Sequence, residues 1–197
     1  DNFVKRSPYL SDRIFSNIKP RIVSGILKIL NLNSSSYNSL SILPSNWPKF
    51  INNSEIDIVH LNWINGEMMS IEDIAKISKP IVWTFHDMWP FQGSTHISDI
   101  KIIKKNKLQK LIDVDKWTYK RKQKNWVRPF QIVSPSNWLT DCVRKSNLMH
   151  NWPVVTIPHS INTDFWKPEE NKIAKKLMGI DENKLVILFG ADGGTKS

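Results

Sequence analysis

The sequence has little cysteine and no long apolar run, and each absence removes a class of protein. Its 197 residues include one cysteine, Cys142, so the chain alone can form neither a disulfide framework nor a cysteine-ligated zinc site. We therefore expect the reducing cytoplasm as its compartment. No stretch approaches the roughly 18 apolar residues that a membrane-spanning helix needs, and the first residues carry no signal-peptide pattern.

The two ends of the chain predict a fragment of a longer gene product. The sequence begins at Asp1 rather than at a methionine and stops at Ser197, shortly after an apolar segment. With 40% apolar residues the chain can still bury a sizeable core, so we expect one domain plus part of another.

Positive charge is concentrated in one segment, residues 101–128, which we call the basic segment. It holds eleven lysines and arginines and two aspartates, a net charge of +9 out of +10 for the whole chain. Interleaved apolar residues predict that much of it is helical. Such a segment could bind phosphorylated ligands, nucleic acid or an anionic membrane, or could be a solvated helix face.

Strand-length apolar runs alternate with helical patterns along the rest of the chain. Strand, helix, strand with short connections is the unit of a parallel sheet, so we predict an α/β fold with a Rossmann-like parallel sheet. Ser70 and Ser136 are placed to cap helices. The predicted strands are 56–61, 81–85, 130–133, 154–157 and 185–189, and the first two are expected to be buried. The predicted helices are 70–77, 138–145 and 173–178, and isoleucines recur at helical spacing within 14–29.

A histidine and an aspartate follow the second predicted strand directly. Ligands of parallel sheets bind at the carboxyl ends of the strands, where loops and helix N-termini present free N–H groups. The imidazole of His86 could meet a phosphate or a sugar hydroxyl, and the carboxylate of Asp87 could bind sugar hydroxyls. Both could equally be satisfied polar groups at a strand end. His96, farther along the loop, has no partner that spacing identifies.

Tryptophans and glycines near the strand ends also allow two interpretations. Trp63, Trp83 and Trp89 could stack on a sugar ring or pack in the core. Gly193 and Gly194 could let the backbone approach a diphosphate or could form a plain turn, and they do not complete a dinucleotide-binding fingerprint.

Five segments occur in an order that is typical of one enzyme family. They are DIVHLNWING at 57–66, TFHDMWPFQGSTH at 84–96, VSPSNWL at 133–139, IPHSINTDFWKP at 157–168 and LFGADGGTK at 188–196. Together they resemble glycosyltransferase family 4, in particular the branch that builds bacterial surface polysaccharides. The resemblance implies a GT-B architecture, with an incomplete acceptor-side domain at 1–165 and, at 166–197, the interdomain connection and the first strand of a truncated donor-binding domain.

The resemblance also implies a reaction. Such enzymes transfer a sugar from a nucleotide-diphosphate donor to a saccharide or lipid-linked acceptor, with retention at the anomeric carbon and without a required metal or other cofactor. On this likeness His86 and Asp87 are the catalytic residues, and Gly193 and Gly194 contact the donor phosphates through backbone N–H groups. The implied acceptor-binding residues are Asn65, Gly66, Trp89 and Ser136.

A lipid-linked acceptor would give the basic segment a role. We expect it to dock a cytoplasmic enzyme peripherally on the anionic inner face of the membrane.

Two departures from the family pattern carry expectations of their own. Asn62 stands where the family usually has a histidine, and Thr95 where it usually has a cysteine, so no metal-stapled loop is expected. The basic residues and paired glutamates that grip the donor would fall beyond Ser197, so we expect the chain as given to be inactive alone.

Two other functions stay open at this point. A non-catalytic relative would only bind saccharides and would lack the donor motifs. A nucleic-acid-binding protein is suggested by Trp117, Tyr119 and Trp126 within the basic segment, although no specific nucleic acid is expected.

Overall fold

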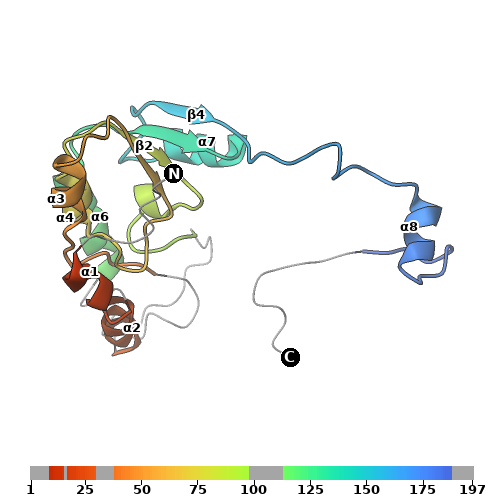
Figure 1. Cartoon of the computed structure of the whole chain (residues 1–197), viewed down its shortest axis with the longest axis horizontal. Coiled ribbons are helices and arrows are strands. Elements are labelled where there is room, and N and C mark those ends of the chain that lie inside the picture. Colours follow the sequence, from red (N-terminus) through yellow and green to blue (C-terminus); the bar gives the residue numbers. More distant parts are fainter. Residues whose placement is uncertain (1–8, 16, 30–37, 98–112, 188–197) are drawn as a thin grey trace. The chain divides into compact units, whose positions relative to one another are not determined.

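The computed structural model describes residues 9–15, 17–29, 38–97 and 113–187, which belong to two compact units, Asp1–Pro158 and His159–Ser197. The predicted domain boundary at residue 165 stays a prediction. In the first unit the elements are α1 (Leu10–Phe15), α2 (Lys19–Ile29), α3 (Trp47–Asn52), β1 (Val59–Asn62), α4 (Ile71–Ala75), β2 (Ile81–Thr84), the 3-10 turn η1 (Trp89–Phe91), α6 (Val114–Asn125), β3 (Gln131–Ser134), α7 (Asn137–Arg144) and β4 (Val154–Thr156); the second unit holds α8 (Asn171–Leu177) (Figure 1).

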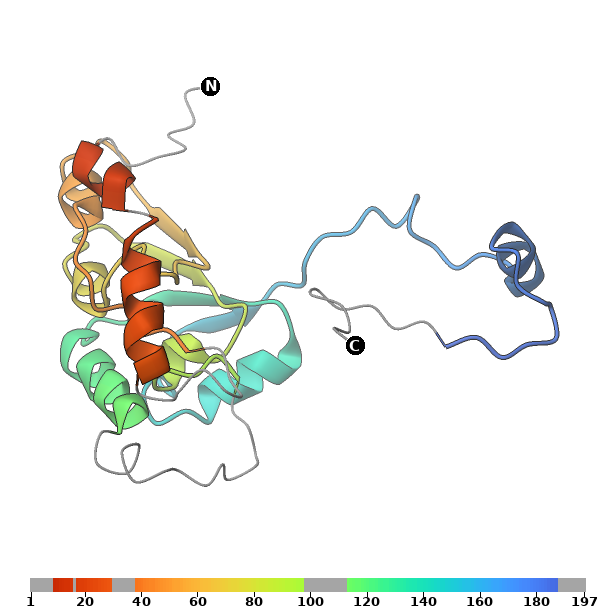
Figure 2. The ribbon, with the colours of Figure 1, turned by 90° about the horizontal axis from the view of Figure 1, so that it is seen from below.

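Four parallel strands form one sheet in the order β1-β2-β3-β4, so neighbours in the sheet are also consecutive strands in the chain (Figures 1 and 2). β1 pairs with β2 from Val59 opposite Ile81 to Asn62 opposite Thr84. Helix α7 packs against β3 and β4. The predicted α/β class with a Rossmann-like parallel sheet is confirmed.

Two serines begin helices as the sequence predicts. The Ser70 hydroxyl accepts a hydrogen bond from the Asp73 N–H at 3.0 Å, and the Asp73 carboxylate accepts one from the Ser70 N–H at 3.3 Å, which forms a capping box. The Ser136 hydroxyl accepts from the Leu139 N–H at 3.2 Å. Both caps satisfy N–H groups that the first helical turn leaves without a partner.

Aromatic side chains fill the core beneath the sheet. Trp83, Phe85 and Trp89 are 2% exposed or less. Trp83 and Phe85 occupy alternate positions and therefore point to the same face of the sheet. The Trp83 ring lies 5.4 Å from that of Phe85 and 5.6 Å from that of Trp126, both edge to face. Of the two interpretations of Trp83 and Trp89, the structure supports the core position.

At one side of the sheet, β1 and β2 bury only alternate residues, whereas the sequence predicts buried strands at 56–61 and 81–85. In β1, buried Val59 and Leu61 alternate with exposed His60 and Asn62. The paired residues on β2 alternate between buried and half-buried in the same register. One face packs on the aromatic core, and the other carries polar and half-buried side chains.

The helices near the N-terminus do not bury their isoleucines. Helix α2 buries Val23 and Leu27, which pack with Leu40, whereas Ile22 and Ile29 are 50% and 79% exposed. The helical prediction for this segment is confirmed, but the apolar stripe that packs is a different one. Pro20 lies in the first turn of α2, where its missing N–H would have no helical acceptor.

The predicted strand at 185–189 is not confirmed. Residues 185–187 form no strand, and Leu185 and Ile187 are 90% and 86% exposed; residues 188 and 189 lie outside the described part. A strand requires a neighbour for its backbone groups, and the described residues of the second unit include no strand to pair with it. The helix before it ends as predicted, because Gly179 takes the left-handed conformation that follows many helices, at φ 66°.

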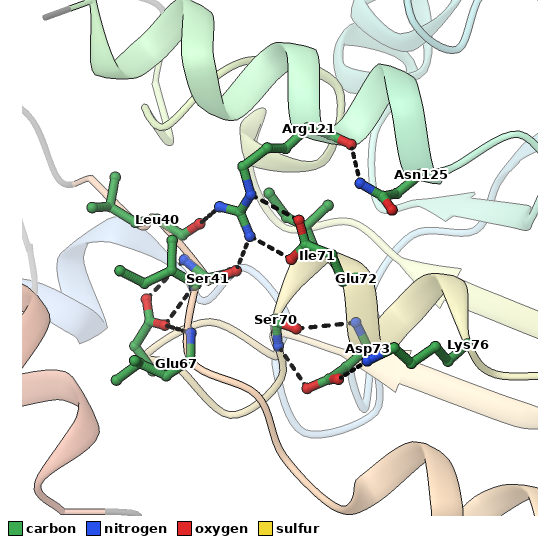
Figure 3. A network of polar contacts seen from close by, with 12 residues as sticks. Leu40, Ser41, Glu67, Ser70, Ile71, Glu72, Asp73, Lys76, Arg121 and Asn125 are labelled. Atoms are coloured by element: carbon green, nitrogen blue, oxygen red, sulfur yellow. Dashed lines mark hydrogen bonds and ion pairs between the residues drawn. The ribbon is translucent and has the colours of Figure 1, made fainter.

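A buried carboxylate holds the segment that precedes α3. Glu67 is 4% exposed and accepts hydrogen bonds from the backbone N–H groups of Ser41, Ile42 and Leu43 at 2.7, 2.8 and 3.0 Å (Figure 3). Three successive amides thus converge on one side chain, which satisfies backbone donors that no strand or helix uses.

An arginine from α6 holds the carbonyl side of the same segment. Arg121 donates to the Leu40 and Ser41 carbonyls at 2.8 Å and to both carboxylate oxygens of Glu72 on α4 (Figure 3). Burial raises the pKa of Glu72, but the hydrogen bond and the charge of Arg121 outweigh it and leave that pKa below its ordinary value. One side chain therefore joins α4, α6 and the segment around Ser41.

Glu67→Ala should lower the free energy of unfolding by about 2 to 3 kcal/mol, because three backbone N–H groups in a partly or fully buried place lose their acceptor. Urea unfolding followed by tryptophan fluorescence would measure the loss. The control is Glu169→Ala at an exposed position, which should stay within about 0.5 kcal/mol of the wild type. Equal stability of the two variants would contradict the role given to Glu67.

Candidate functional site

The imidazole of His86 lies at the carboxyl end of β2 and is exposed. Its Nε2 forms a short hydrogen bond with Asn62 Oδ1 at the end of the neighbouring strand β1. An amide oxygen only accepts, so the Nε2–H of His86 is the donor, and this bond fixes both the orientation of the ring and the nitrogen that carries the proton. Asn62, which stands where the family usually has a histidine, thus orients His86, the candidate catalytic residue.

The sequence contains a signal for this pair. In a parallel sheet the carboxyl ends of neighbouring strands lie together, and the register places Asn62 opposite Thr84, two residues before His86. A polar residue at the end of one strand therefore lies beside a polar residue just past the end of the next.

Asp87 uses both of its oxygens inside the His86–His96 loop, which comprises residues 86–96. Oδ1 accepts from the Trp89 N–H at 2.9 Å, and Oδ2 lies 2.6 Å from Nδ1 of His96. His96 is 4% exposed, and its Nε2 lies 2.8 Å from the Ser39 hydroxyl. The carboxylate therefore holds the loop that carries His86. His96 had no partner identifiable from spacing because its second contact spans 57 residues.

A buried lysine holds the same loop from α6. Lys122 is fully buried, and its ammonium group donates to the backbone carbonyls of Trp89, Gln92 and Gly93, the last at 2.7 Å. Its Nζ also lies 3.7 Å from the centre of the Trp89 ring, within the range of a cation–π interaction. Burial lowers the pKa of Lys122 well below its ordinary value, and the charges of Asp115 and Asp87 raise it in part. Lysine is rarely buried so completely unless it is paired, and here its partners are three backbone carbonyls and the indole of Trp89.

A second residue of α6 completes this attachment. The Asp115 carboxylate accepts from the Ser94 N–H at 2.8 Å and from the Ser94 hydroxyl at 3.2 Å. Gly93 approaches Asp115 so closely that a Cβ atom at this position would overlap the carboxylate and the backbone carbonyl. The glycine is required for the close approach of the loop to the helix.

The basic segment divides into structural and exposed residues. Residues 101–112 lie outside the described part of the chain. Of the six remaining basic residues, Arg121 and Lys122 make the contacts above, and Arg128 donates to the three carbonyls of residues 77–79 just after α4. The other three are exposed and four residues apart, which places them on one face of α6: Lys116, Lys120 and Lys124.

The predicted acceptor-binding residues occupy different environments. Asn65 is 9% exposed, and its buried Oδ1 accepts no hydrogen bond from a described residue. Gly66 has φ 71° in the turn after β1. Trp89 is fully buried, its indole N–H donates to the Ser39 carbonyl at 2.8 Å, and its ring offers no surface to a ligand. Contact of these residues with an acceptor stays a prediction, as it does for Ser136, whose hydroxyl caps α7.

The predicted donor-binding residues, Gly193 and Gly194, lie outside the described residues. Within the described ranges, no group of three or more histidine, cysteine, aspartate or glutamate side chains could hold a metal ion. No helix formed by those residues is long and apolar enough to cross a membrane.

Lys122→Met should lower the free energy of unfolding by about 3 kcal/mol, because three buried carbonyls lose their hydrogen-bond donor. The effect should also depend on pH. Since burial lowers the pKa of Lys122, the unfolded chain binds more protons than the folded protein between the folded-state pKa and about 10.4, and wild-type stability gains from this residue as pH rises through that window.

Urea titrations across that pH range would separate this contribution, which Lys122→Met should lack. Lys120→Met, at an exposed position of the same helix, serves as the control and should leave both the stability and its pH dependence unchanged. A pH profile of Lys122→Met that parallels the wild type would contradict the assignment.

Comparison with known proteins places this site within a family. The family model for Glycosyltransferase Family 4 matches residues 8–165. The chain matches no curated protein and no solved structure. The matched residues include all four strands, the Asn62–His86 pair, the His86–His96 loop and its attachments to α6. The chain belongs to glycosyltransferase family 4.

Proposed function

We propose that the protein is a GT-B glycosyltransferase that moves a sugar from a nucleotide-diphosphate sugar to a saccharide or lipid-linked acceptor, with retention, in the synthesis of a surface polysaccharide. The observation that carries the proposal is the exposed, oriented imidazole of His86 at the carboxyl edge of a parallel sheet in a family 4 chain. Ligands of parallel sheets bind at this edge.

In the proposed reaction the bond between the anomeric carbon and the donor diphosphate breaks, and a bond to an acceptor hydroxyl oxygen forms. The diphosphate leaves with the electron pair of the broken bond and can take the proton that the acceptor loses. His86 would lie beside the transferred sugar, with its Nε2 proton held by Asn62. Backbone N–H groups at Gly193 and Gly194 would stabilise the leaving diphosphate, so the proposal requires no metal.

The two parts of the chain have separate roles in this proposal. Residues 1–165 form the acceptor side and residues 166–197 begin the donor-binding domain. Asn65 and Gly66 in the turn after β1, and Ser136 at the start of α7, lie at carboxyl ends of strands, where an acceptor would bind. Asp87 and Trp89 support that side through the His86–His96 loop.

His86→Ala in the full-length enzyme should lower turnover about 100- to 1000-fold, because a hydrogen-bonding group beside the reacting sugar is lost. A donor screen that follows nucleoside diphosphate release would supply the assay. His150→Ala, at an exposed histidine just after α7, is the control and should retain wild-type turnover. Both variants should unfold at the wild-type urea concentration. Unchanged turnover in His86→Ala would remove His86 from the mechanism.

The proposal also places the enzyme on the anionic cytoplasmic face of the membrane. Lys116, Lys120 and Lys124 present three charges on one exposed face of α6, and a lysine near an anionic surface contributes about 1 kcal/mol to binding. A lipid-linked acceptor would be found at that surface.

Replacing these three lysines with glutamine should weaken binding to vesicles that contain phosphatidylglycerol about 100-fold, as measured by co-sedimentation. The control is the same replacement at three other exposed lysines, Lys49, Lys145 and Lys184, which should change binding much less. Wild-type binding to neutral phosphatidylcholine vesicles that equals binding to anionic ones would refute membrane docking through charge.

A further inference from the structure

The turn after β1 holds a tryptophan in a backbone conformation that aromatic residues seldom adopt. Trp63 has φ 43° and is 51% exposed. In this left-handed region Cβ comes too close to the following carbonyl oxygen, so the conformation is unfavourable for any residue with a side chain and is an outlier for a bulky one. Such conformations persist where the surrounding structure fixes them, and they cluster at ligand-binding sites.

The rest of the turn supplies that fixation. Gly66 and Glu67 also have positive φ, at 71° and 62°, and Ile64 is 4% exposed in the core. The Glu67 carboxylate is held by the three amides of residues 41–43 (Figure 3). The turn is therefore anchored on both sides of Asn65, and Trp63 is its outward-facing aromatic residue.

Another tryptophan of similar exposure provides the contrast. Trp117 on α6 is 48% exposed, but the guanidinium group of Arg121 lies 4.6 Å from the centre of its ring. The Trp63 ring has no aromatic or cationic partner among the residues that the structure describes. At 51% exposure, the Trp63 side chain offers surface to a ligand.

We propose that Trp63 is a stacking platform for a pyranose ring of the acceptor. The inference rests on the proposed function, since it names the residue that would receive the saccharide. Trp63 directly follows Asn62, whose amide holds His86, so the platform lies one residue from the hydrogen bond that orients the candidate catalytic group. A pyranose has an apolar C–H face and a rim of hydroxyl groups. The face fits an exposed indole, and the rim of hydroxyl groups fits the indole N–H.

The inference adds Trp63 to the acceptor-binding residues that the family resemblance implies in this turn, Asn65 and Gly66. The side-chain oxygen of Asn65 is buried, whereas Trp63, two positions earlier, is 51% exposed.

Three variants of the full-length protein test the platform: Trp63→Phe, Trp63→Ala and Trp63→Gly. Saturation-transfer NMR against a panel of methyl hexopyranosides, together with the acceptor KM once turnover is assayed, measures binding. Alanine and glycine should both weaken binding about tenfold, and phenylalanine should weaken it less. Because glycine lacks the Cβ atom that strains the left-handed backbone, Trp63→Gly should also melt about 2 to 4 °C above Trp63→Ala.

The matched control is Trp117→Ala, an exposed tryptophan removed from a helix, which should bind the glycosides as the wild type does. Wild-type binding in Trp63→Ala and Trp63→Gly would overturn the inference while leaving the proposed function intact. Weaker binding of UDP or GDP by these two variants, with unchanged glycoside binding, would also overturn the inference, because it would place Trp63 on the donor side. If Trp63→Gly melts no higher than Trp63→Ala, the claim that the backbone at position 63 is strained is overturned. If the wild type binds no glycoside and transfers no sugar, the proposed function itself fails, and the inference fails with it.

Discussion

The ammonium group of Lys122 is the contact on which the arrangement of the site depends. It brings three backbone carbonyls of the His86–His96 loop and the face of Trp89 onto α6. These carbonyls belong to a short irregular segment, and without a donor they would be buried and unsatisfied. A long, flexible side chain with three N–H groups can reach all of them, which a shorter polar residue of α6 could not do.

The same helix links the site to the rest of the domain. Arg121, adjacent to Lys122 in the chain, faces Glu72 and the carbonyls around Ser41, and Asp115 holds the far end of the loop. Neighbouring residues of one helix therefore hold two irregular segments through long side chains that carry several N–H donors. This explains why half of the described basic residues of the basic segment are not available to a partner, and why charge counted along the sequence overstates the charged surface.

The exposed imidazole of His86 lies at the start of a loop that is held by several hydrogen bonds. His86 touches Asn62, while the residue after it, Asp87, is committed to Trp89 and His96. The exposed imidazole of His86 is open to the solvent, whereas the carboxylate of Asp87 holds the loop in place. In the proposed reaction His86 must be held to within fractions of an ångström, so the contacts that support its loop matter as much as its own hydrogen bond to Asn62.

The sequence by itself determined the α/β class with a parallel sheet, the helix starts at Ser70 and Ser136 and the family, because these depend on local pattern, capping chemistry and contiguous motifs. Only the tertiary structure decided which tryptophans are core, that Asn62 orients His86, and that His96, Ser39 and Lys122 support the loop. These contacts join residues 24 to 57 positions apart, and spacing along the chain does not encode them. The sequence pattern did not determine burial either. The isoleucines at helical spacing in α2 and the apolar run in β1 show which residues could pack in a core. The neighbours that the fold supplies decide which of these residues are buried.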